Sequence, residues 1–372
     1  MRTLIVFGTR PEAIKMAPVV AALSEDSRFA VEVCVTAQHR EMLDQVLSFF
    51  AIEPAYDLDL MQPDQGIGEV TARVVTNMEP VLRQARPDVM LVQGDTTTSF
   101  AAALAAYYAK VRVGHVEAGL RTGDRYSPYP EEMNRMLTGR LADYHFPPTE
   151  RARQNLMREG VCDESICVTG NTVVDALLVA RQKVESWRPE AVEGLPPLDW
   201  SRRLVLITAH RRESFGEGLD DVFRSIAELA RANDDVNFVF PVHPNPNVRG
   251  PATRILEDAA NVYLIDPVDY PLLVWLMSRS YLILTDSGGI QEEAPSLGVP
   301  VLVMREKTER PEGVEVGAVK LVGTDPAAIV GEASALLKGG PEYQRMSRAG
   351  NPYGDGRAAE RIRDFLGERL VA

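Results

Sequence analysis

The sequence predicts an α/β protein with two domains. A chain of 372 residues and 41.0 kDa exceeds the size that one hydrophobic core usually serves, so about two domains are expected. Short runs of branched and aromatic residues recur, each followed by a turn and a helical pattern, as in residues 281–297. A proline-containing stretch without periodicity, residues 187–201, separates a predicted first domain at 1–186 from a second at 202–350.

Composition narrows the class of function. The chain is 45% hydrophobic and 25% charged, and no apolar run approaches the roughly 20 residues that span a bilayer, so no membrane partner is expected. The amino terminus lacks the long apolar region of a signal peptide, which indicates a cytoplasmic protein. A net charge of -13 disfavours nucleic acid as a partner. A small ligand bound by local cations is expected instead.

The cysteines are expected to be buried free thiols. Cys34, Cys162 and Cys167 are odd in number, and no cysteine or histidine pair has the spacing of metal ligands. The sequence therefore predicts no metal site.

A glycine turn joins a strand at residues 281–284 to a helix at 288–297. Ser287 is the expected N-cap, and Gly288 and Gly289 leave room for an anion at the unpaired N–H groups of the helix. Such a turn is also common as a plain connection in α/β proteins, so a purely structural role stays open.

Charged residues surround this turn in the sequence. Of Glu292 and Glu293, in the first helical turn, one is expected to face solvent and the other to reach toward a ribose hydroxyl. Three cations follow the next strand, at the sheet edge where open α/β sheets bind ligands. They are Arg305, Lys307 and Arg310.

The first strand, residues 4–7, leads into a different kind of turn. A dinucleotide-binding turn has the spacing G-x-G-x-x-G, whereas residues 8–12 carry the bulky Arg10, so NAD is not expected. Pro11 marks the start of the following helix. Arg10 and Lys15 either point into a ligand cleft as cations or are solvated surface residues.

Three carboxylates fall at the starts or ends of elements that should converge on one side of the first sheet. They are Asp95, Glu117 and Glu131. Paired carboxylates are what proton transfer requires. Asp95 has an alternative role as the N-cap of a helix that starts at Thr97. Glu131 has an alternative role in the first turn of its helix, where the helix dipole stabilises a negative charge. Glu117 follows a strand and precedes Gly119, an unfavourable loop composition unless the carboxylate is used.

In the second domain, a strand at residues 204–209 delivers His210 and Arg212. His210 occupies the position that faces the crevice of an open α/β sheet, which favours a functional role. Arg212 is equally compatible with a functional role and with a purely structural one. For His39, in the first domain, no local feature decides between function and structure.

Ten blocks in order along almost the whole chain carry a family resemblance: GTRPEAIKMAP, TAQHREMLDQV, GDTTTS, GHVEAGLRTG, PEEMNR, TGNTVVDAL, HRRESFG, TDSGGIQEEAPSLGVPVLVMR, TERPEG and NPYGDG. With these blocks the chain closely resembles the non-hydrolysing UDP-N-acetylglucosamine 2-epimerases. The resemblance implies two Rossmann-like domains in the glycosyltransferase-B arrangement, with the active site in the interdomain cleft. It also implies that the second domain binds UDP and that residues 351–372 cross back to the first domain.

The resemblance further implies a reaction. Members interconvert UDP-N-acetylglucosamine and UDP-N-acetylmannosamine at C2, by eliminating UDP to a 2-acetamidoglucal and adding it back, without NAD or metal. It implies a homodimer that binds both sugar nucleotides and UDP. The matching motifs carry catalytic roles to Asp95, Glu117, Glu131 and His210. They carry substrate-binding roles to Arg10, Lys15, Ser287, Gly288, Gly289, Glu293 and Arg310.

Some members are activated by their substrate, and the loops that match that region contain Gln38, His39, Arg211 and His243. The chain departs from the family at Val268 and Leu273, where members often present a glutamine and a phenylalanine around the uracil. Two alternatives remain. A glycosyltransferase of the same fold would share the UDP site, and a catalytically silent sugar-nucleotide sensor would not need three convergent acids.

Overall fold

The computed structural model describes residues 1–36, 40–61, 65–188, 192, 194–195, 197–211 and 215–370. The chain forms two compact units. Unit 1 comprises Met1–Leu178 and Tyr353–Ala372, and unit 2 comprises Val179–Pro352, so the division falls within helix α7 (Thr172–Val184). The predicted domain ranges, which also assign a function to each domain, stay a prediction.

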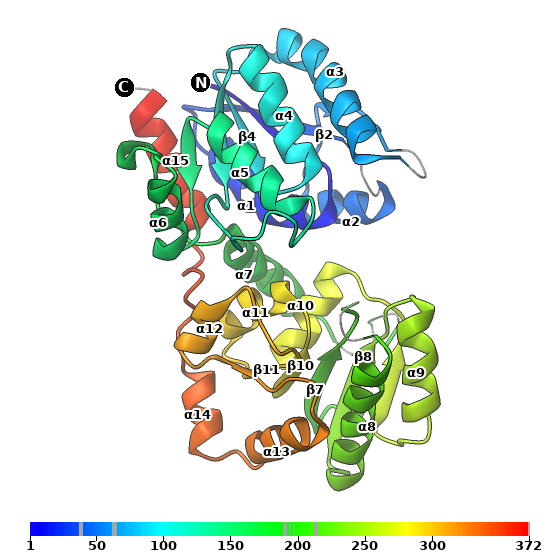
Figure 1. Ribbon diagram of the computed structural model, residues 1–372. Helices are drawn as coiled ribbons and strands as arrows, with labels where there is room; N and C mark the ends of the chain where they lie inside the picture. Colours follow the sequence, from blue (N-terminus) through cyan, green and yellow to red (C-terminus); the bar gives the residue numbers. More distant parts are fainter. Residues whose placement is uncertain are drawn as a thin grey trace. The chain divides into compact units, whose positions relative to one another are not determined.

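Unit 1 alternates strands with helices (Figure 1). Its elements are β1 (Arg2–Phe7), α1 (Arg10–Ser24), β2 (Ala30–Val35), α2 (Arg40–Phe50), β3 (Tyr56–Asp57), α3 (Ile67–Ala85), β4 (Val89–Gln93), α4 (Thr97–Tyr108), β5 (Arg112–Val116), α5 (Glu131–Leu141), β6 (Tyr144–Phe146), α6 (Glu150–Arg158), a 3-10 turn (Asp163–Ser165), the start of α7, and α15 (Ala358–Leu370). Over the described residues the strands form one parallel six-stranded sheet in the order β3-β2-β1-β4-β5-β6.

Unit 2 has the same alternation. Its elements are β7 (Arg203–Thr208), α8 (Glu217–Ala232), β8 (Val236–Pro241), α9 (Pro246–Leu256), β9 (Val262–Ile265), α10 (Tyr270–Arg279), β10 (Leu282–Thr285), α11 (Gly288–Glu293), a 3-10 turn (Ala294–Leu297), β11 (Val301–Val303), α12 (Pro311–Glu315), β12 (Val319–Leu321), α13 (Pro326–Leu337) and α14 (Pro341–Ser347). Its described strands also form one parallel six-stranded sheet, in the order β12-β11-β10-β7-β8-β9.

The two strand orders are equivalent. Counted from its own first strand, each sheet reads 3-2-1-4-5-6, the order of Rossmann-like domains. The predicted α/β class with two such domains is therefore confirmed. The order reverses between β1 and β4 in unit 1 and between β7 and β10 in unit 2. Ligands of such sheets bind beyond the carboxyl ends of the strands at these points.

Helices cover both faces of each sheet, which explains why the central strands are continuously apolar. All five residues of β4 are buried. In unit 1, α3 and α4 pack over β1, β2 and β4, whereas α1 packs against α2 and α15. In unit 2, α8, α9 and α13 share a core with β7, β8 and β10.

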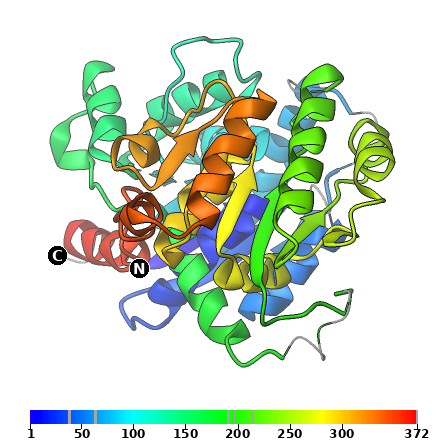
Figure 2. The same cartoon turned by 90° about the horizontal axis from the view of Figure 1, so that it is seen from below.

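The last helix, α15, belongs to unit 1, although all the residues of unit 2 separate it in the chain from the rest of that unit. Phe365 of α15 makes edge-to-face contacts with Tyr144 and Phe146 of β6, with ring centroids 5.9 and 5.6 Å apart. Asp175 of α7 accepts a hydrogen bond of 2.8 Å from Ala359 N, near the start of α15. The end of α15 and the start of β1 lie close together in both views of the fold (Figure 1 and Figure 2), and Met1 and Leu370 line one pocket.

Two local predictions are wrong. The branched residues Ile166 and Val168 predict a short strand at 166–168, but Ile166 forms only an isolated bridge with His145, beside the short edge strand β6. Cys34 is a buried thiol as expected, whereas Cys167 is partly exposed and Cys162 is exposed. Cys162 immediately precedes the surface turn at Asp163–Ser165, where no element covers it. Within the described residues, no helix combines the length and the apolar character needed to cross a membrane.

Candidate active site

The candidate residues of unit 1 lie at the carboxyl ends of its central strands. Arg10 begins α1 two residues after β1, Asp95 follows β4 and Glu117 follows β5. The start of α1 is fixed by a reciprocal capping box, in which Thr9 and Glu12 satisfy each other's backbone N–H groups. Pro11 lies in the first turn, which confirms the predicted helix start.

Glu117 is the most constrained carboxylate of the site. Its side chain is 5% exposed and forms an ion pair with Lys15, whose Nζ lies 2.6 Å from Oε2 and 2.8 Å from Oε1. Gln93 Nε2 donates a second hydrogen bond to Oε2, and Asn171 Nδ2 lies 3.5 Å from Oε1. Three donors from β4, α1 and the start of α7 therefore surround one carboxylate. Lys15, to which the resemblance gives a substrate-binding role, also holds Glu117.

The backbone of Glu117 is strained. Its φ of 62° lies in the left-handed region, which costs a residue other than glycine roughly 1–3 kcal/mol. Glu117 N donates to Phe146 O at 3.0 Å, so the adjacent strand β6 holds this conformation. Close packing follows at Gly119, where a Cβ would collide with the carbonyl oxygen of Ala152. Such strain at a ligand-binding edge is typical of functional residues.

Asp95 does not cap helix α4, so that alternative is wrong. The N-cap is Thr96, whose Oγ1 accepts a hydrogen bond of 3.0 Å from Ser99 N. The Asp95 carboxylate instead forms an ion pair with Arg135 of α5, and Asn134 Nδ2 donates to Asp95 O at 3.0 Å. The turn after β4 is thereby linked to the helix that carries Glu131.

The two glutamates at the start of α5 have different surroundings. Glu132 is buried and accepts hydrogen bonds from the backbone N–H groups of Thr122 and Gly123, and it pairs with Arg135 at 3.0 Å. It fixes the loop that leads from β5 into α5. Glu131 Oε2 is buried but has no hydrogen-bond partner among the described residues. An unpartnered buried carboxylate oxygen is costly in a purely structural role and is suited to accepting a proton from a ligand.

A buried histidine supports the turn after β4. His115 Nε2 lies 2.7 Å from Gly94 O, and because a carbonyl only accepts, Nε2 carries the proton. Burial lowers the pKa of His115 to about 3, and burial also lowers the pKa of the neighbouring His145 to about 4. Both imidazoles are therefore neutral at physiological pH and belong to the core.

In unit 2, the turn after β10 is built as the sequence predicted. Ser287 is the N-cap of α11, although its side chain makes no capping hydrogen bond, and Gly288 and Gly289 form the first turn. The expectation that one of Glu292 and Glu293 faces solvent is wrong, since both are buried. Each has a nearby donor: Arg310 Nε lies 2.9 Å from Glu292 Oε1, and the Tyr270 hydroxyl lies 2.9 Å from Glu293 Oε1.

Arg305 and Arg310, two of the cations that follow β11, have different surroundings. Arg305 is buried and paired with Glu309 at 3.0 and 3.1 Å. Although burial opposes ionisation, the hydrogen bonds from Arg305 bring the pKa of Glu309 to about 2. Arg305 is thus part of the loop's own structure. The Arg310 guanidinium lies beside the glycine turn, close to Gly288.

His210 lies at the switch point of unit 2 and is held by Asp286, the residue that follows β10. Asp286 Oδ2 accepts hydrogen bonds from His210 N at 2.6 Å and Arg211 N at 2.7 Å. His210 Nδ1 lies 3.4 Å from Asp286 Oδ1 without hydrogen-bond geometry. Burial lowers the pKa of His210, the Asp286 carboxylate opposes this, and Arg211 and His243 add to it. The His243 ring stacks on His210 at 5.6 Å.

Some candidates lie outside the described residues, namely Gln38, His39 and Arg212. Val268 and Leu273, which replace common uracil contacts, are both half-buried in unit 2. Among the described residues, no group of three or more His, Cys, Asp or Glu side chains is arranged to hold a metal ion.

Comparison with known proteins identifies the family. A model of the UDP-N-acetylglucosamine 2-epimerase family matches residues 21–367. The UDP-N-acetylglucosamine 2-epimerase of Escherichia coli K12 is 59% identical over 375 residues, which cover 100% of both chains. The chain belongs to the UDP-N-acetylglucosamine 2-epimerase family.

Solved structures agree with this membership. The epimerase from Neisseria meningitidis, crystallised with UDP-GlcNAc, is 49% identical and superimposes with a TM-score of 0.91 over 99% of this chain and 100% of that one. The epimerase from Methanocaldococcus jannaschii, in complex with UDP-GlcNAc and UDP, is 34% identical with a TM-score of 0.79 over 99% and 100%. Both comparisons span essentially the whole length of this epimerase family member.

Sequence reasoning missed several residues that the structure places at the site. Gln93 and Asn171 contact Glu117, Arg135 pairs with Asp95, and Asp286 holds His210. Gln93 and Asp286 do stand at the carboxyl ends of predicted strands, a position that could have identified them. Nothing in the local sequence around Asn171 or Arg135 signals their partners.

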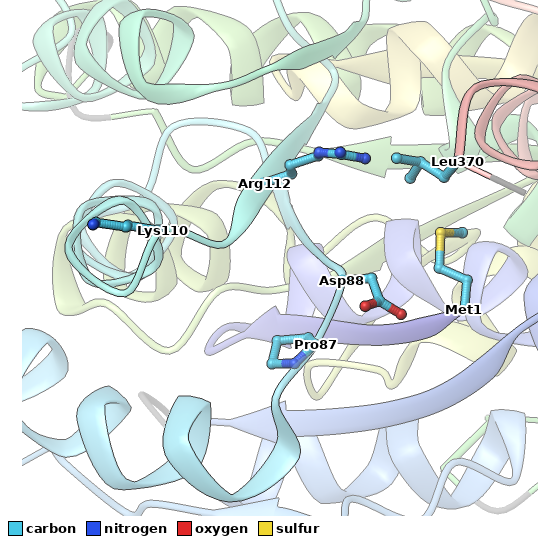
Figure 3. A pocket seen from close by; sticks show the side chains of 6 residues that line it. All are labelled: Met1, Pro87, Asp88, Lys110, Arg112 and Leu370. Atoms are coloured by element: carbon cyan, nitrogen blue, oxygen red, sulfur yellow. The ribbon is translucent and has the colours of Figure 1, made fainter.

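A pocket of about 660 Å³ in unit 1 is separate from this site (Figure 3). Its lining residues are Met1, Pro87, Asp88, Lys110, Arg112 and Leu370. Most of them lie at the amino ends of β1, β4 and β5. Because the strands are parallel, this is the edge of the sheet opposite to the one that carries Asp95 and Glu117.

Proposed function

We propose that this protein reversibly interconverts UDP-N-acetylglucosamine and UDP-N-acetylmannosamine by inverting the configuration at C2. One observation carries the proposal: the identity of 59% to the Escherichia coli K12 enzyme of that name extends over the whole of both chains. Relatives crystallised with UDP-GlcNAc or UDP support the choice of ligand. The carboxylates at the carboxyl edge of unit 1 supply the proton-transfer groups that the reaction needs.

The chemistry explains why a carboxylate alone does not suffice. No carbonyl is attached to C2, so its proton becomes acidic only as the bond from C1 to the diphosphate loosens and positive charge develops on the ring. The electron pair of the C1–O bond leaves with UDP, the C2 proton passes to a carboxylate, and a C1–C2 double bond forms. The neutral intermediate is a 2-acetamidoglucal. Readdition of UDP at C1 with protonation of C2 from the other face gives the epimer.

In this proposal unit 1 provides the acids and bases. Inversion requires groups on two faces of C2, which Asp95, Glu117 and Glu131 can supply together. Glu131 Oε2 is buried and has no hydrogen-bond partner in the described part of the chain, which supports its role as a proton acceptor. The donors around Glu117 hold its carboxylate in one position, as a proton-transfer group requires.

Unit 2 provides the diphosphate site in this proposal. The N–H groups at Gly288 and Gly289 and the guanidinium of Arg310 are suited to the negative charge that develops on the leaving group. His210, held by Asp286, supplies a further donor. Glu293, buried beside Tyr270, is proposed to meet the ribose hydroxyls.

Elimination followed by addition exchanges no hydride with a cofactor, so we propose that the enzyme turns over without NAD or metal. Arg10 at the first turn, where a dinucleotide-binding protein has glycine, supports this. The family resemblance also leads us to propose a cytoplasmic homodimer.

The direct test incubates the purified full-length protein with UDP-N-acetylglucosamine and follows the anomeric signals by proton NMR, without added NAD. We expect UDP-N-acetylmannosamine to appear and the same equilibrium mixture to form from either epimer. A protein that releases UDP only when an acceptor sugar is present would be a transferase. A protein that binds both nucleotides and converts neither would be a sensor.

A further inference from the structure

We propose that Gln93 is a positioning residue that fixes the carboxylate of Glu117 for proton transfer. The inference rests on the proposed function and assigns a role in it to a residue that no family motif marked as catalytic. Three observations support it: the position of Gln93 at the end of β4, the backbone conformation of Glu117, and the donors that surround the Glu117 carboxylate.

The parallel register of two strands places Gln93 beside Glu117. Gln93 is the last residue of β4 and pairs with Val116, the last residue of β5. Glu117 comes next and adopts φ 62°, which changes the direction in which its side chain leaves the backbone. An extended residue would continue the alternation of the strand and point to the face opposite to that of Val116. The strained conformation instead allows the carboxylate to meet Gln93, Lys15 and Asn171.

The hydrogen bond between Gln93 and Glu117 is buried. Both residues are buried, so water does not replace a lost partner easily. Gln93 Nε2 donates to Oε2, the same oxygen that Lys15 approaches to 2.6 Å. Breaking this contact would leave buried polar atoms unsatisfied, which is unfavourable.

A neutral donor has an advantage over Lys15 in this position. A lysine ammonium is attracted to any anion, and the family resemblance also gives Lys15 a substrate-binding role. The amide of Gln93 carries no net charge and is therefore less attracted to the ligand's phosphates. Gln93 can keep its hydrogen bond to the carboxylate while Lys15 interacts with the ligand. Since a displacement of 1 Å at a reacting group can lower turnover by about a hundredfold, this constraint matters for catalysis.

The alternative is that Gln93 only stabilises the end of β4. The two roles differ in what a substitution changes. A structural residue affects the melting temperature and leaves the pH dependence of turnover alone. A positioning residue lowers kcat more than it raises KM, and it changes the acidic limb of the pH profile, because removing a donor makes the carboxylate easier to protonate.

The test substitutes Gln93→Met in the full-length chain, which keeps the length and volume of the side chain and removes the amide. Turnover of UDP-N-acetylglucosamine is measured from pH 5 to pH 9, alongside UDP affinity and the melting temperature. We expect kcat to fall by about tenfold to a hundredfold, with KM and UDP affinity changed by less than about threefold. The acidic limb should move to higher pH. Gln93→Asn, a shorter side chain that keeps the amide, should recover part of kcat and serves if the methionine variant does not fold.

A matched control is Asn237→Leu. Asn237 is a buried strand amide in β8 whose Nδ2 donates to Asp199 O at 2.8 Å, and it belongs to none of the candidate groups. We expect this variant to melt at a lower temperature with an unchanged kcat and pH profile. If Gln93→Met behaves in the same way, Gln93 is a structural residue and the inference is wrong.

A double-mutant cycle connects the effect to Glu117. In a Glu117→Gln background no carboxylate remains to be positioned, so adding Gln93→Met should lower residual turnover by less than about twofold. Equal effects of Gln93→Met in both backgrounds would overturn the inference. Failure of the proposed function looks different, because the unsubstituted protein would then not interconvert the two sugar nucleotides at all.

Discussion

The guanidinium of Arg310 lies directly beside Gly288, the first residue of the turn that begins α11. A Cβ built on Gly288 would stand 3.3 Å from Arg310 Cζ, tighter than ordinary van der Waals contact. Arg310 is also held by the buried Glu292, whose Oε1 accepts a hydrogen bond of 2.9 Å from Arg310 Nε. The absence of a side chain at Gly288 therefore allows a cation and the N–H groups of a helix to share one small region, an arrangement suited to phosphate oxygens.

This relationship predicts the effect of Gly288→Ala. The new methyl group should displace the Arg310 guanidinium by a few tenths of an ångström and crowd the approach of a phosphate. We expect UDP affinity to fall by about threefold to tenfold, roughly 0.7–1.4 kcal/mol. Isothermal titration with UDP measures this. The control is Gly331→Ala in α13, where a Cβ meets no atom within 4 Å, and it should bind UDP normally. If Gly288→Ala binds UDP normally, Arg310 is not part of the diphosphate site.

The carboxylates of unit 1 should matter for turnover and not for UDP binding. Replacing Asp95, Glu117 or Glu131 by its amide keeps the shape of the side chain and removes the proton acceptor. We expect UDP affinity to change little, while turnover falls by about a hundredfold or more. Glu150→Gln is a suitable control, because Glu150 lies in the first turn of α6 and is 57% exposed. If all three variants epimerise at a near-normal rate, the three carboxylates have structural roles only. His210 would then be the leading candidate for the base.

Stability should fall with decreasing pH because of buried histidines. An unfolded histidine has a pKa near 6.5, whereas burial lowers the pKa of His115 to about 3 in the fold. Below pH 6.5 the unfolded chain binds a proton that the folded chain does not, so this part of the stability is complete above pH 6.5 and is lost toward pH 3. The free energy of unfolding should decrease by about 1.4 kcal/mol per pH unit for this residue, or about 2 kcal/mol at pH 5.

His115→Gln isolates the contribution, because the glutamine does not titrate and keeps an N–H for Gly94 O. Urea unfolding between pH 7 and pH 4.5 should show a shallower loss of stability for this variant than for the unsubstituted protein. Burial raises the pKa of Asp175 to about 6, so its contribution to stability increases as the pH falls, opposite to that of His115. This contribution is the same in both proteins and cancels in the difference between them. Parallel curves for His115→Gln and the unsubstituted protein would contradict the assignment.

Sequence reasoning located elements and edges well because these depend on local patterns. The apolar strand before Gly8, the capped helix from Arg10 and the glycine turn at Ser287 are all set by neighbouring residues. The α/β class and the two-domain organisation follow from the repetition of such units.

Side-chain partners were not predictable in the same way. Gln93 and Glu117 are 24 residues apart, and Asp286 and His210 are 76 apart. They meet only because the parallel strands bring distant carboxyl ends to one edge. The N-cap of α4 was misassigned because Asp95 and Thr96 are both good capping residues, and the long-range pair with Arg135 decides between them.

The measurement that tests the central claim most directly is hydrogen exchange at C2. The purified protein is incubated with UDP-N-acetylglucosamine in D2O without NAD, and the recovered sugar nucleotides are analysed by NMR and mass spectrometry. Elimination gives the C2 proton to a side chain that equilibrates with solvent, so we expect deuterium at C2 of the UDP-N-acetylmannosamine that forms. Deuterium should also enter the recovered UDP-N-acetylglucosamine as the reaction reverses. Epimerisation that retains the original hydrogen at C2, or that occurs only after NAD is added, would contradict the account.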